Sequence, residues 1–251
     1  MKAILLAAGY ATRLYPLTLN FPKALLPINC VPVINIIIHK LELIPDINEI
    51  IVVTNNRFHT DFKNWAKEYH FKKKVTILND KTASDEDKLG AIADLGFVID
   101  KKNIKEDIVI IGADNLFDAK LGNFIKWGRE SKKICVGLFD FKKKTEVTKY
   151  GVVRIGRNRK ITNFQEKPRQ PKSTLVAMCL YYFPKGKGKI IDRYLRLSQK
   201  KDAVGHYISW LVKKGYAYGW VFNGRWFDIG DKKQYFKANK TFQTVIHPDL
   251  I

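Results

Sequence analysis

The chain alternates short apolar runs with longer segments in which apolar residues recur every three to four positions. The continuous runs have the length and the Val/Ile content of buried strands, and the spaced segments have the period of helices that bury one face. The runs predict strands at Lys2–Ala8, Glu49–Thr54, Val75–Leu78, Asp107–Gly112 and Lys133–Phe139. The spaced segments predict helices at Val33–Leu43, Thr60–Tyr69, Gly90–Lys101 and Leu121–Ser131. This alternation predicts βαβ units, and therefore an open, mostly parallel α/β sheet with helices on both faces.

The second half of the chain has a more β-rich pattern. Two apolar runs, Tyr150–Ile155 and Ile161–Gln165, flank a turn at Gly156–Lys160 and predict a hairpin. Further strands are predicted at Leu175–Phe183 and Ala217–Phe222, and helices at Lys187–Gln199, His206–Lys214 and Asp231–Val245. We therefore expect a single domain over residues 1–251, with a parallel-sheet half (1–140), a small β-rich lobe (141–230) and a C-terminal helix (231–251).

Composition narrows the class of protein. Of 251 residues, 46% are apolar, which is enough for a sizeable core, yet no run approaches the ~20 apolar residues of a membrane span. The three cysteines, Cys30, Cys135 and Cys179, are widely spaced and form no C-x-x-C pair. We expect free, mostly buried thiols in a reducing cytoplasm, no structural zinc site and no membrane partner, and we leave a homo-oligomer open.

The formal net charge is +21, which raises the question of a nucleic-acid partner. The lysines, however, are spread over the whole chain, in clusters such as Lys72–Lys74 and Lys142–Lys144, and no basic stripe or tail concentrates them. A solvated surface is the simpler interpretation, so nucleic acid is an unlikely partner. Part of the excess charge would also attract a polyanionic substrate such as a nucleoside triphosphate.

The most informative motif is the loop that follows the first predicted strand. Small residues around Gly9 let backbone N–H groups approach an anion closely, and Arg13 and Lys23 add positive charge suited to polyphosphate oxygens. The loop lacks the Gly-Lys-Ser/Thr ending of a Walker A motif and the full G-x-G-x-x-G of a dinucleotide site. A phosphate-binding loop of another kind is therefore predicted.

Two other segments also lie at the carboxyl ends of predicted strands. In an open α/β sheet, ligands bind beyond these ends, so Gly9–Arg13, Asp80–Lys88 and Ala113–Asn115 should converge on one nucleotide site. Asp114, beside a bound triphosphate, is a natural Mg²⁺ ligand. The polar segment Asp80–Lys88 is a candidate lid.

These motifs resemble those of the sugar-1-phosphate nucleotidylyltransferases, and most of all the glucose-1-phosphate thymidylyltransferases. The resemblance runs from Lys2 to about Gly230 and keeps the family's order of motifs. It rests on L-A-A-G-Y-A-T-R-L-Y-P-L-T (6–18), P-K-A-L-L-P (22–27), G-A-D-N (112–115), E-K-P (166–168) and W-F-D-I-G (226–230). It implies a Rossmann-like nucleotidyltransferase fold and the reaction of a nucleoside triphosphate with a sugar 1-phosphate to give a nucleotide-sugar and pyrophosphate.

The resemblance also implies roles for individual residues. Residues 1–140 become the nucleotide-binding half and 141–230 the acceptor-binding half. The residues that would bind the nucleotide are Leu6, Ala8, Gly9, Thr12, Arg13, Lys23, Gly90 and Asp114. Gly151, Glu166 and Lys167 would bind the acceptor, with the carboxylate of Glu166 on sugar hydroxyls and the ammonium of Lys167 on the sugar phosphate. Asp114 and Asp228 would hold Mg²⁺, while Arg13, Lys23 and Asp114 would act in catalysis.

Three departures from the family pattern leave the substrates open. Ala11 stands where the family usually has Gly, so a positive φ there would strain the loop. Met178-Cys179 replaces small residues near the sugar, and no Gln precedes Gly90 to read the base. Carboxylates in the Asp80–Lys88 loop (Asp85, Glu86 and Asp87) would favour a base with amino donors, whereas reading by backbone groups near Leu6 and Gly90 would favour thymidine or uridine triphosphate.

Two alternative functions are also compatible with parts of the sequence. A cytidylyltransferase acting on phosphocholine or inositol phosphate could use an aromatic box of Tyr181, Tyr182 and Trp226. A catalytically silent nucleotide sensor or an RNA-associated basic protein is a further alternative. Because the chain stops soon after its last helix, we expect no β-helix domain and no acetyl transfer. Asp231 is expected to cap that helix rather than to bind metal.

Overall fold

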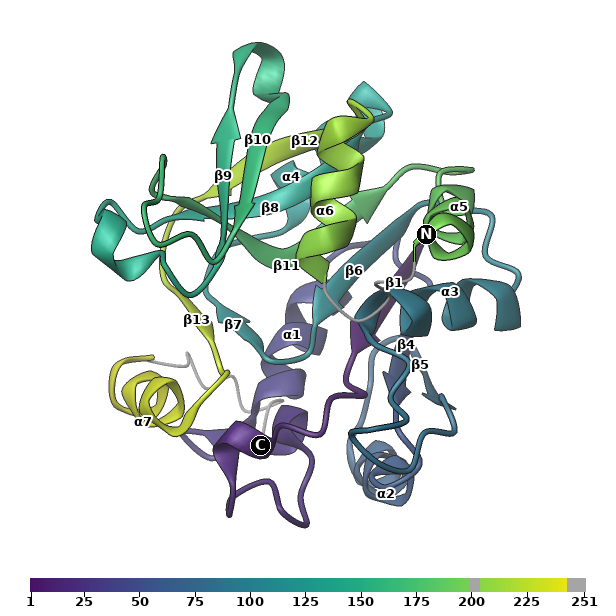
Figure 1. The fold of residues 1–251 in the computed structure, drawn as a ribbon. Helices are drawn as coiled ribbons and strands as arrows, with labels where there is room; N and C mark the ends of the chain where they lie inside the picture. The colour runs from purple at the N-terminus through teal and green to yellow at the C-terminus, as the bar shows by residue number, and fades with distance from the viewer. Residues whose placement is uncertain (199–203, 243–251) are drawn as a thin grey trace.

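The computed structural model describes residues 1–198 and 204–242, which fold around one nine-stranded sheet (Figure 1). The strand order is β10-β9-β11-β6-β1-β4-β5, with β8 beside β11 and β12 beside β8. The strands are β1 (Lys2–Leu6), β4 (Glu49–Thr54), β5 (Lys74–Asn79), β6 (Ile108–Gly112), β8 (Ile134–Asp140), β9 (Gly151–Ile155), β10 (Ile161–Glu166), β11 (Leu175–Phe183) and β12 (Ala217–Phe222). The helices are α1 (Val33–Glu42), α2 (His59–Glu68), α3 (Ala91–Lys101), α4 (Gly122–Ser131), α5 (Lys189–Leu197), α6 (Val204–Lys213) and α7 (Lys232–Thr241).

The first half of the sheet is parallel, as the alternating pattern predicts. β1 runs parallel to β4 and β6, and β4 runs parallel to β5. β11 then enters antiparallel to β6, β8 and β9, so the β-rich second half continues the same sheet. The predicted open α/β fold is confirmed, and the predicted elements agree with the observed ones to within two residues, except for the last helix. The predicted ends at Gln199 and Val245 lie outside the described residues, but α7 already ends at Thr241, because Phe242 has extended backbone geometry, so the predicted end at Val245 is wrong.

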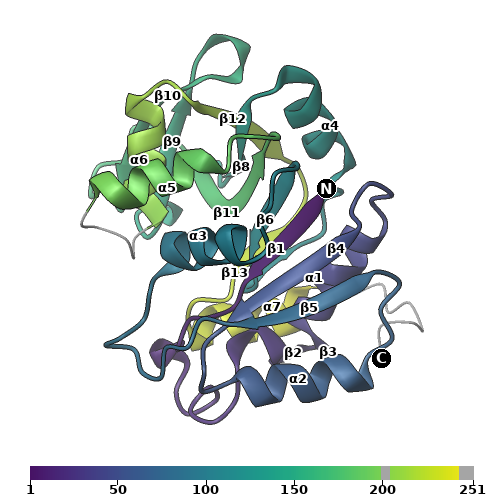
Figure 2. The same ribbon diagram turned by 90° about the vertical axis from the view of Figure 1, so that its right-hand side faces the viewer.

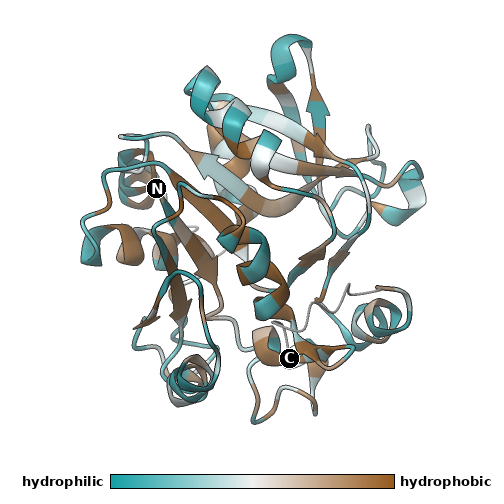
Figure 3. Cartoon of the chain, turned by 180° about the vertical axis from the view of Figure 1, so that it is seen from behind, coloured by the Kyte–Doolittle hydropathy of each residue, from teal (hydrophilic) through white to brown (hydrophobic). Residues whose placement is uncertain are grey.

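Strands β1, β4 and β6 of the parallel half are mostly buried on both faces because helices cover both sides (Figure 2), whereas the edge strand β5 is only half-buried. Alternate residues of β1 belong to different cores: Ala3 and Leu5 pack with α1, whereas Ile4 packs with α3. Figure 3 shows the parallel strands mainly in the hydrophobic colour, while α2 and α7 are mainly hydrophilic. This two-sided burial explains why these strands are continuous apolar runs rather than alternating ones.

Two very short strands, β7 (Asn115–Phe117) and β13 (Trp226–Asp228), form a separate antiparallel pair (Figure 1). Asp228 lies opposite Asn115 in this register, and the indole Nε1 of Trp226 donates to Oδ1 of Asn115 at 2.7 Å. The sequence analysis predicts neither strand, because three residues are too few to show a period. A second short pair, β2 (Pro27–Ile28) with β3 (Val31–Pro32), is likewise absent from the predicted elements.

Several smaller expectations are also settled by the structure. Cys135 is buried and Cys179 half-buried, but Cys30 is exposed, so the prediction of mostly buried thiols is wrong for Cys30, which lies in the tight turn between β2 and β3. Tyr181 and Tyr182 point into the two opposite cores, because neighbouring strand residues face opposite ways, and they cannot form one aromatic box. Asp231 caps α7 by accepting from the backbone N–H of Gln234 at 2.8 Å, as expected. Within the described ranges, no helix has the length and apolarity needed to cross a membrane.

Candidate active site

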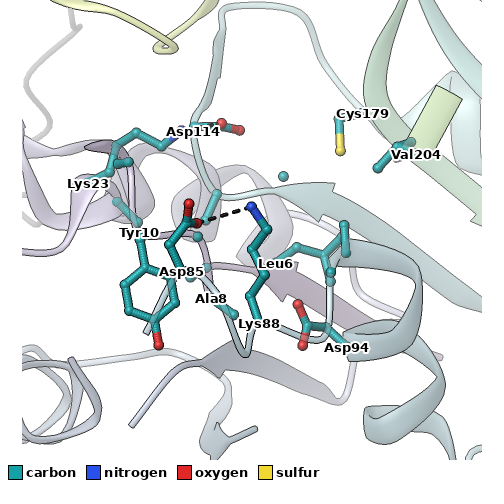
Figure 4. Close-up of a pocket in the computed structure, with 18 of the residues that line it drawn as sticks. Leu6, Ala8, Tyr10, Lys23, Asp85, Lys88, Asp94, Asp114, Cys179 and Val204 are labelled. Carbon is teal, nitrogen blue, oxygen red and sulfur yellow. Dashed lines mark hydrogen bonds and ion pairs between the residues drawn. The ribbon is translucent and has the colours of Figure 1, made fainter. Parts of the chain in front are cut away.

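A cavity of about 400 Å³ opens at the carboxyl ends of β1 and β6 (Figure 4). The loop after β1, the end of β6, the segment before α3, and single residues of β11 and α6 form its walls. All eight residues predicted to bind nucleotide line it: Leu6, Ala8, Gly9, Thr12, Arg13, Lys23, Gly90 and Asp114. The three strand-end segments therefore converge, as the parallel topology predicts.

The loop after β1 turns at Ala11, which has φ 51° and ψ 39° and so lies in the left-handed region. The carbonyl of Ala11 accepts from the Thr18 hydroxyl at 2.8 Å and from the Leu14 N–H at 2.9 Å, and a 3₁₀ turn at Thr12–Leu14 follows. These bonds hold the strained residue in place. The expectation that Ala11 occupies a position suited to glycine is confirmed.

Lys23 and Asp114 form the shortest polar contact of the cavity: Nζ lies 2.6 Å from Oδ2. Lys23 starts the 3₁₀ turn Lys23–Leu25, and Asp114 follows β6. The backbone carbonyl of Asp114 accepts from the N–H of Ile229 at 3.0 Å, which ties this segment to β13. Both side chains are mostly shielded from solvent, with 19% exposure for Lys23 and 27% for Asp114.

Asp228 reaches the same site through the β7–β13 pairing. Burial, and then the negative charge of Asp114, raise the pKa of Asp228 from its ordinary value of 3.8 to about 6, while Lys23 and Arg13 act in the opposite direction. A Cβ placed on Gly230 would lie 3.6 Å from Nη2 of Arg13 and 3.7 Å from Oδ2 of Asp228. Two carboxylates and two cations that are far apart in the sequence are thus brought together.

The donor set suits a hard divalent cation. Two neighbouring carboxylates disfavour each other's charge, and a cation between them would relieve this repulsion. Across residues 1–198 and 204–242, no cluster of three or more His, Cys, Asp or Glu side chains could hold a metal. Two carboxylates with substrate phosphates and waters match the needs of Mg²⁺, which dehydrates reluctantly.

The predicted acceptor residues lie beside this cavity and do not line it. Gly151 pairs with Glu166 across β9 and β10. The Glu166 carboxylate also abuts Gly205 of α6, whose neighbour Val204 forms part of the cavity wall. Lys167 has φ 42° and an exposed side chain, with Nζ 3.9 Å from Oε1 of Glu166. The three residues therefore form a second group, separated from the phosphate loop by α6.

The loop between β5 and α3 contributes side chains that the sequence analysis did not single out. Asp80 is buried and accepts from the backbone N–H and hydroxyl of Thr82, and burial raises its pKa. Of the three loop carboxylates considered for base reading, Asp85 lines the cavity, paired with Lys88 at 3.1 Å (Figure 4). Asp87 instead accepts from the backbone N–H groups of Ala83 and Ser84. The position of Asp80 directly after a strand was the available signal for its role in the cavity.

Cys179 and Val204 also line the cavity, opposite Asp114 (Figure 4). Cys179 has φ 47° and sits where the register of β11 with β8 shifts. The sequence analysis noted Cys179 as a departure near the sugar, and the structure places its thiol in the cavity itself. Val204 carried no signal, because an apolar residue at the start of a helix is ordinary.

The raised pKa of Asp228 predicts a pH-dependent stability. Because the folded protein holds a proton that the unfolded chain releases, stability falls as pH rises from about 4 to about 6 and stays reduced above that. In metal-free buffer at pH 7, Asp228→Asn should therefore raise Tm by about 2–4 °C, the shift that about 1 kcal/mol produces in a chain of this size. The gain should vanish near pH 4. Asp85→Asn is the control, and an equal gain for it, or none for Asp228→Asn, would contradict the assignment.

The left-handed Ala11 predicts an unequal response to substitution. Ala11→Gly removes a left-handed strain of about 1–2 kcal/mol but adds about 0.5–1 kcal/mol of unfolded-chain entropy, so stability should be unchanged or slightly higher. Ala11→Val places a β-branched residue at positive φ and should lower stability clearly. Urea unfolding of the three proteins measures this, and equal losses for both variants would show that the loop does not need this conformation.

The sequence matches the nucleotidyl transferase family over residues 2–245. It is 29% identical to the bifunctional protein GlmU of Methanocaldococcus jannaschii, over 100% of this chain and 56% of that protein. It is 30% identical to the UTP–glucose-1-phosphate uridylyltransferase AglF of Haloferax volcanii, over 73% of this chain and 72% of that protein. A crystal structure from Bacillus anthracis, named as a glucose-1-phosphate thymidylyltransferase, superposes with a TM-score of 0.81 at 26% identity, covering 96% of this chain and 94% of that one.

Several of the curated relatives are longer than this chain, which spans little more than half of the GlmU proteins. The family predicted from the phosphate loop and the strand-end carboxylates is nevertheless confirmed, because the match extends over nearly the whole chain. The protein belongs to the nucleotidyl transferase family.

Proposed function

We propose that this protein transfers a nucleotidyl group from a nucleoside triphosphate to a sugar 1-phosphate and releases pyrophosphate. One observation carries this proposal: Arg13, Lys23 and Asp114 line the same cavity as the phosphate loop, and β13 brings Asp228 next to them. Two cations suit a polyphosphate, and two carboxylates suit the cation that accompanies it. The names of the related uridylyltransferase and of the thymidylyltransferase structure support the same reaction class.

The chemistry asks the protein mainly for positioning and charge neutralisation. A phosphate oxygen of the acceptor attacks the α-phosphorus in line as pyrophosphate leaves, so no covalent enzyme intermediate is needed. Backbone N–H groups of the Gly9 loop and the guanidinium of Arg13 hold the departing pyrophosphate. Lys23 contacts phosphate oxygens during transfer, where charge develops.

Members of this family generally use a divalent metal, and we propose Mg²⁺ held by Asp114 and Asp228. When bound, Mg²⁺ neutralises phosphate charge and polarises the phosphoryl oxygens. Asp228 binds a cation only as a carboxylate, so its raised pKa predicts weaker metal binding below about pH 6.

We assign the acceptor to the second half of the chain, 141–230, and the nucleotide to residues 1–140. Glu166 accepts from sugar hydroxyls, and Gly151 opposite it lets the ring of Phe164 pack against the backbone, since a Cβ there would lie 2.6 Å from that ring and 3.4 Å from Oε2 of Glu166. The ammonium of Lys167 lies 3.9 Å from Oε1 of Glu166, and it moves away from this carboxylate to bind the acceptor phosphate. A sugar suits these groups better than choline does, because Tyr181 and Tyr182 are buried in separate cores.

For the donor, thymidine or uridine triphosphate is favoured when the base is read by backbone groups near Leu6 and Gly90. Asp85 is the loop carboxylate placed to prefer an amino-bearing base instead. The three free thiols fit the proposed cytoplasmic location, where thiols stay reduced.

Loss of either carboxylate tests the reaction. Asp114→Asn and Asp228→Asn should each lower pyrophosphate release from a triphosphate and a sugar 1-phosphate by at least about a hundredfold, the scale of losing one charge-stabilising contact. Circular dichroism should show the fold intact. Asp85→Asn serves as the matched control in the same cavity, and full activity of either metal-site variant at saturating Mg²⁺ would refute the assignment.

Because the acceptor residues lie apart from the phosphate loop, a substitution at Lys167 should change the KM of one substrate and not of the other. Lys167→Ala should raise the KM for the sugar 1-phosphate by about tenfold or more, the scale of one lost charge-assisted hydrogen bond, and leave the KM for the triphosphate nearly unchanged. Titrating each substrate separately measures the difference. Lys172→Ala, an exposed lysine beyond the same hairpin, is the control, and a rise confined to the triphosphate KM would move Lys167 to the nucleotide site.

A further inference from the structure

Lys23 and Asp114 each have a proposed ligand, yet in this structure they bind each other. The contact of 2.6 Å between Nζ and Oδ2 is short even for a charge-assisted hydrogen bond, and both side chains are mostly shielded from solvent. Shielding strengthens the attraction, because water screens the pair less than it would at the surface.

The two proposed roles compete with this contact. While Nζ of Lys23 lies 2.6 Å from Oδ2 of Asp114, a divalent cation on that oxygen would lie against a like charge, and one N–H of the ammonium is committed to the carboxylate instead of a phosphate group. The other oxygen, Oδ1, accepts from the side-chain amide of Asn115 at 3.2 Å. Cation binding at Asp114 therefore competes with an existing partner.

Lys23 also supplies the charge that a metal would supply. Its ammonium contacts Asp114, and the backbone carbonyl of Asp114 accepts from Ile229, the residue after Asp228. One positive charge thus already offsets the repulsion between the two carboxylates. A divalent cation that enters alone would have to displace this charge, leaving the ammonium without a partner in a site of low exposure.

A triphosphate changes that balance because it gives Lys23 a new partner. Lys23 belongs to the same phosphate-binding region as Gly9 and Arg13, and all three line one cavity. When the ammonium moves to a phosphate oxygen, Oδ2 of Asp114 becomes open to the metal, which also gains phosphate ligands.

We propose that Lys23 holds the place of the divalent cation on Asp114 until a triphosphate draws it away, so that metal and triphosphate bind interdependently. The inference rests on the proposed function, since it takes the triphosphate as the donor and the two carboxylates as metal ligands. It assigns Lys23 a role before the transfer step, namely to keep the metal site closed to free cation. The coupling is reciprocal: the metal must favour triphosphate binding as much as the triphosphate favours metal binding.

Direct titration with Mn²⁺, followed by electron paramagnetic resonance of the free ion, tests the first half in the absence of phosphate. Lys23→Gln should bind Mn²⁺ at least about tenfold more tightly than the wild type, the equilibrium equivalent of removing one charge-assisted competitor. Lys23→Met repeats the test with an apolar side chain of similar length.

A matched control separates this contact from a general effect of charge. Lys88→Gln removes a positive charge from the same cavity, where Lys88 pairs with Asp85 at 3.1 Å. It should therefore change Mn²⁺ affinity by much less than Lys23→Gln does. An equal gain for both variants, or no gain for Lys23→Gln and Lys23→Met, would overturn the proposal.

The coupling is measured with inorganic tripolyphosphate, which carries the phosphate charges without a base. Calorimetry gives the affinity for tripolyphosphate with and without Mg²⁺. Because Mg²⁺ also binds tripolyphosphate in solution, the wild type is compared with Lys23→Gln, for which this contribution is the same. The wild type should gain more affinity on adding Mg²⁺ than Lys23→Gln gains, by at least about tenfold. An equal gain would contradict the proposal. If the wild type binds neither tripolyphosphate nor any nucleoside triphosphate, the proposed function fails, whereas the Mn²⁺ titration still reports on the Lys23–Asp114 contact alone.

Discussion

The candidate site depends on the antiparallel pairing of two three-residue strands, β7 and β13. The register sets Asp228 opposite Asn115, and the N–H of Ile229 donates to the carbonyl of Asp114. The buried bond from Trp226 to Asn115 anchors this pair on the core side. Without these contacts, nothing would hold Asp228 beside Asp114, which lies more than one hundred positions away in the sequence.

This pairing brings charges together at a cost that a ligand can offset. Two carboxylates with little solvent between them repel, which is why burial and Asp114 raise the pKa of Asp228 to about 6. Lys23 on Asp114 and Arg13 near Gly230 compensate for part of this repulsion. The same arrangement that is unfavourable for the protein alone is suited to a polyphosphate and its cation, since each brings the charge that the site lacks.

Two positions of the cavity wall carry side chains at backbone conformations that favour glycine. Ala11 has φ 51° and Cys179 has φ 47°, and both line the cavity. Each adds a Cβ, and in one case a thiol, where glycine would leave space for a ligand. Hydrogen bonds fix Ala11, and Cys179 lies where the register of β11 with β8 shifts, so both departures from the family pattern lie on the cavity wall.

The sequence by itself determined the elements and one side of the site. Apolar runs and helical periods gave the parallel strands, and because the carboxyl ends of parallel strands meet at one edge, they also gave the convergence of Gly9, Gly90 and Asp114. The positive φ of Ala11 and the cap at Asp231 followed from local chemistry.

Only the tertiary structure decided which distant groups touch. The β7–β13 pair is too short to leave a period, Val204 carries no motif, and the Lys23–Asp114 bond joins residues 91 positions apart. Tyr181 and Tyr182 face opposite ways because they are neighbours in a strand, but the burial of both depends on helices covering both faces of the sheet. Local pattern fixes elements because the backbone period is local, whereas contacts between strand ends depend on register and packing that no single segment encodes.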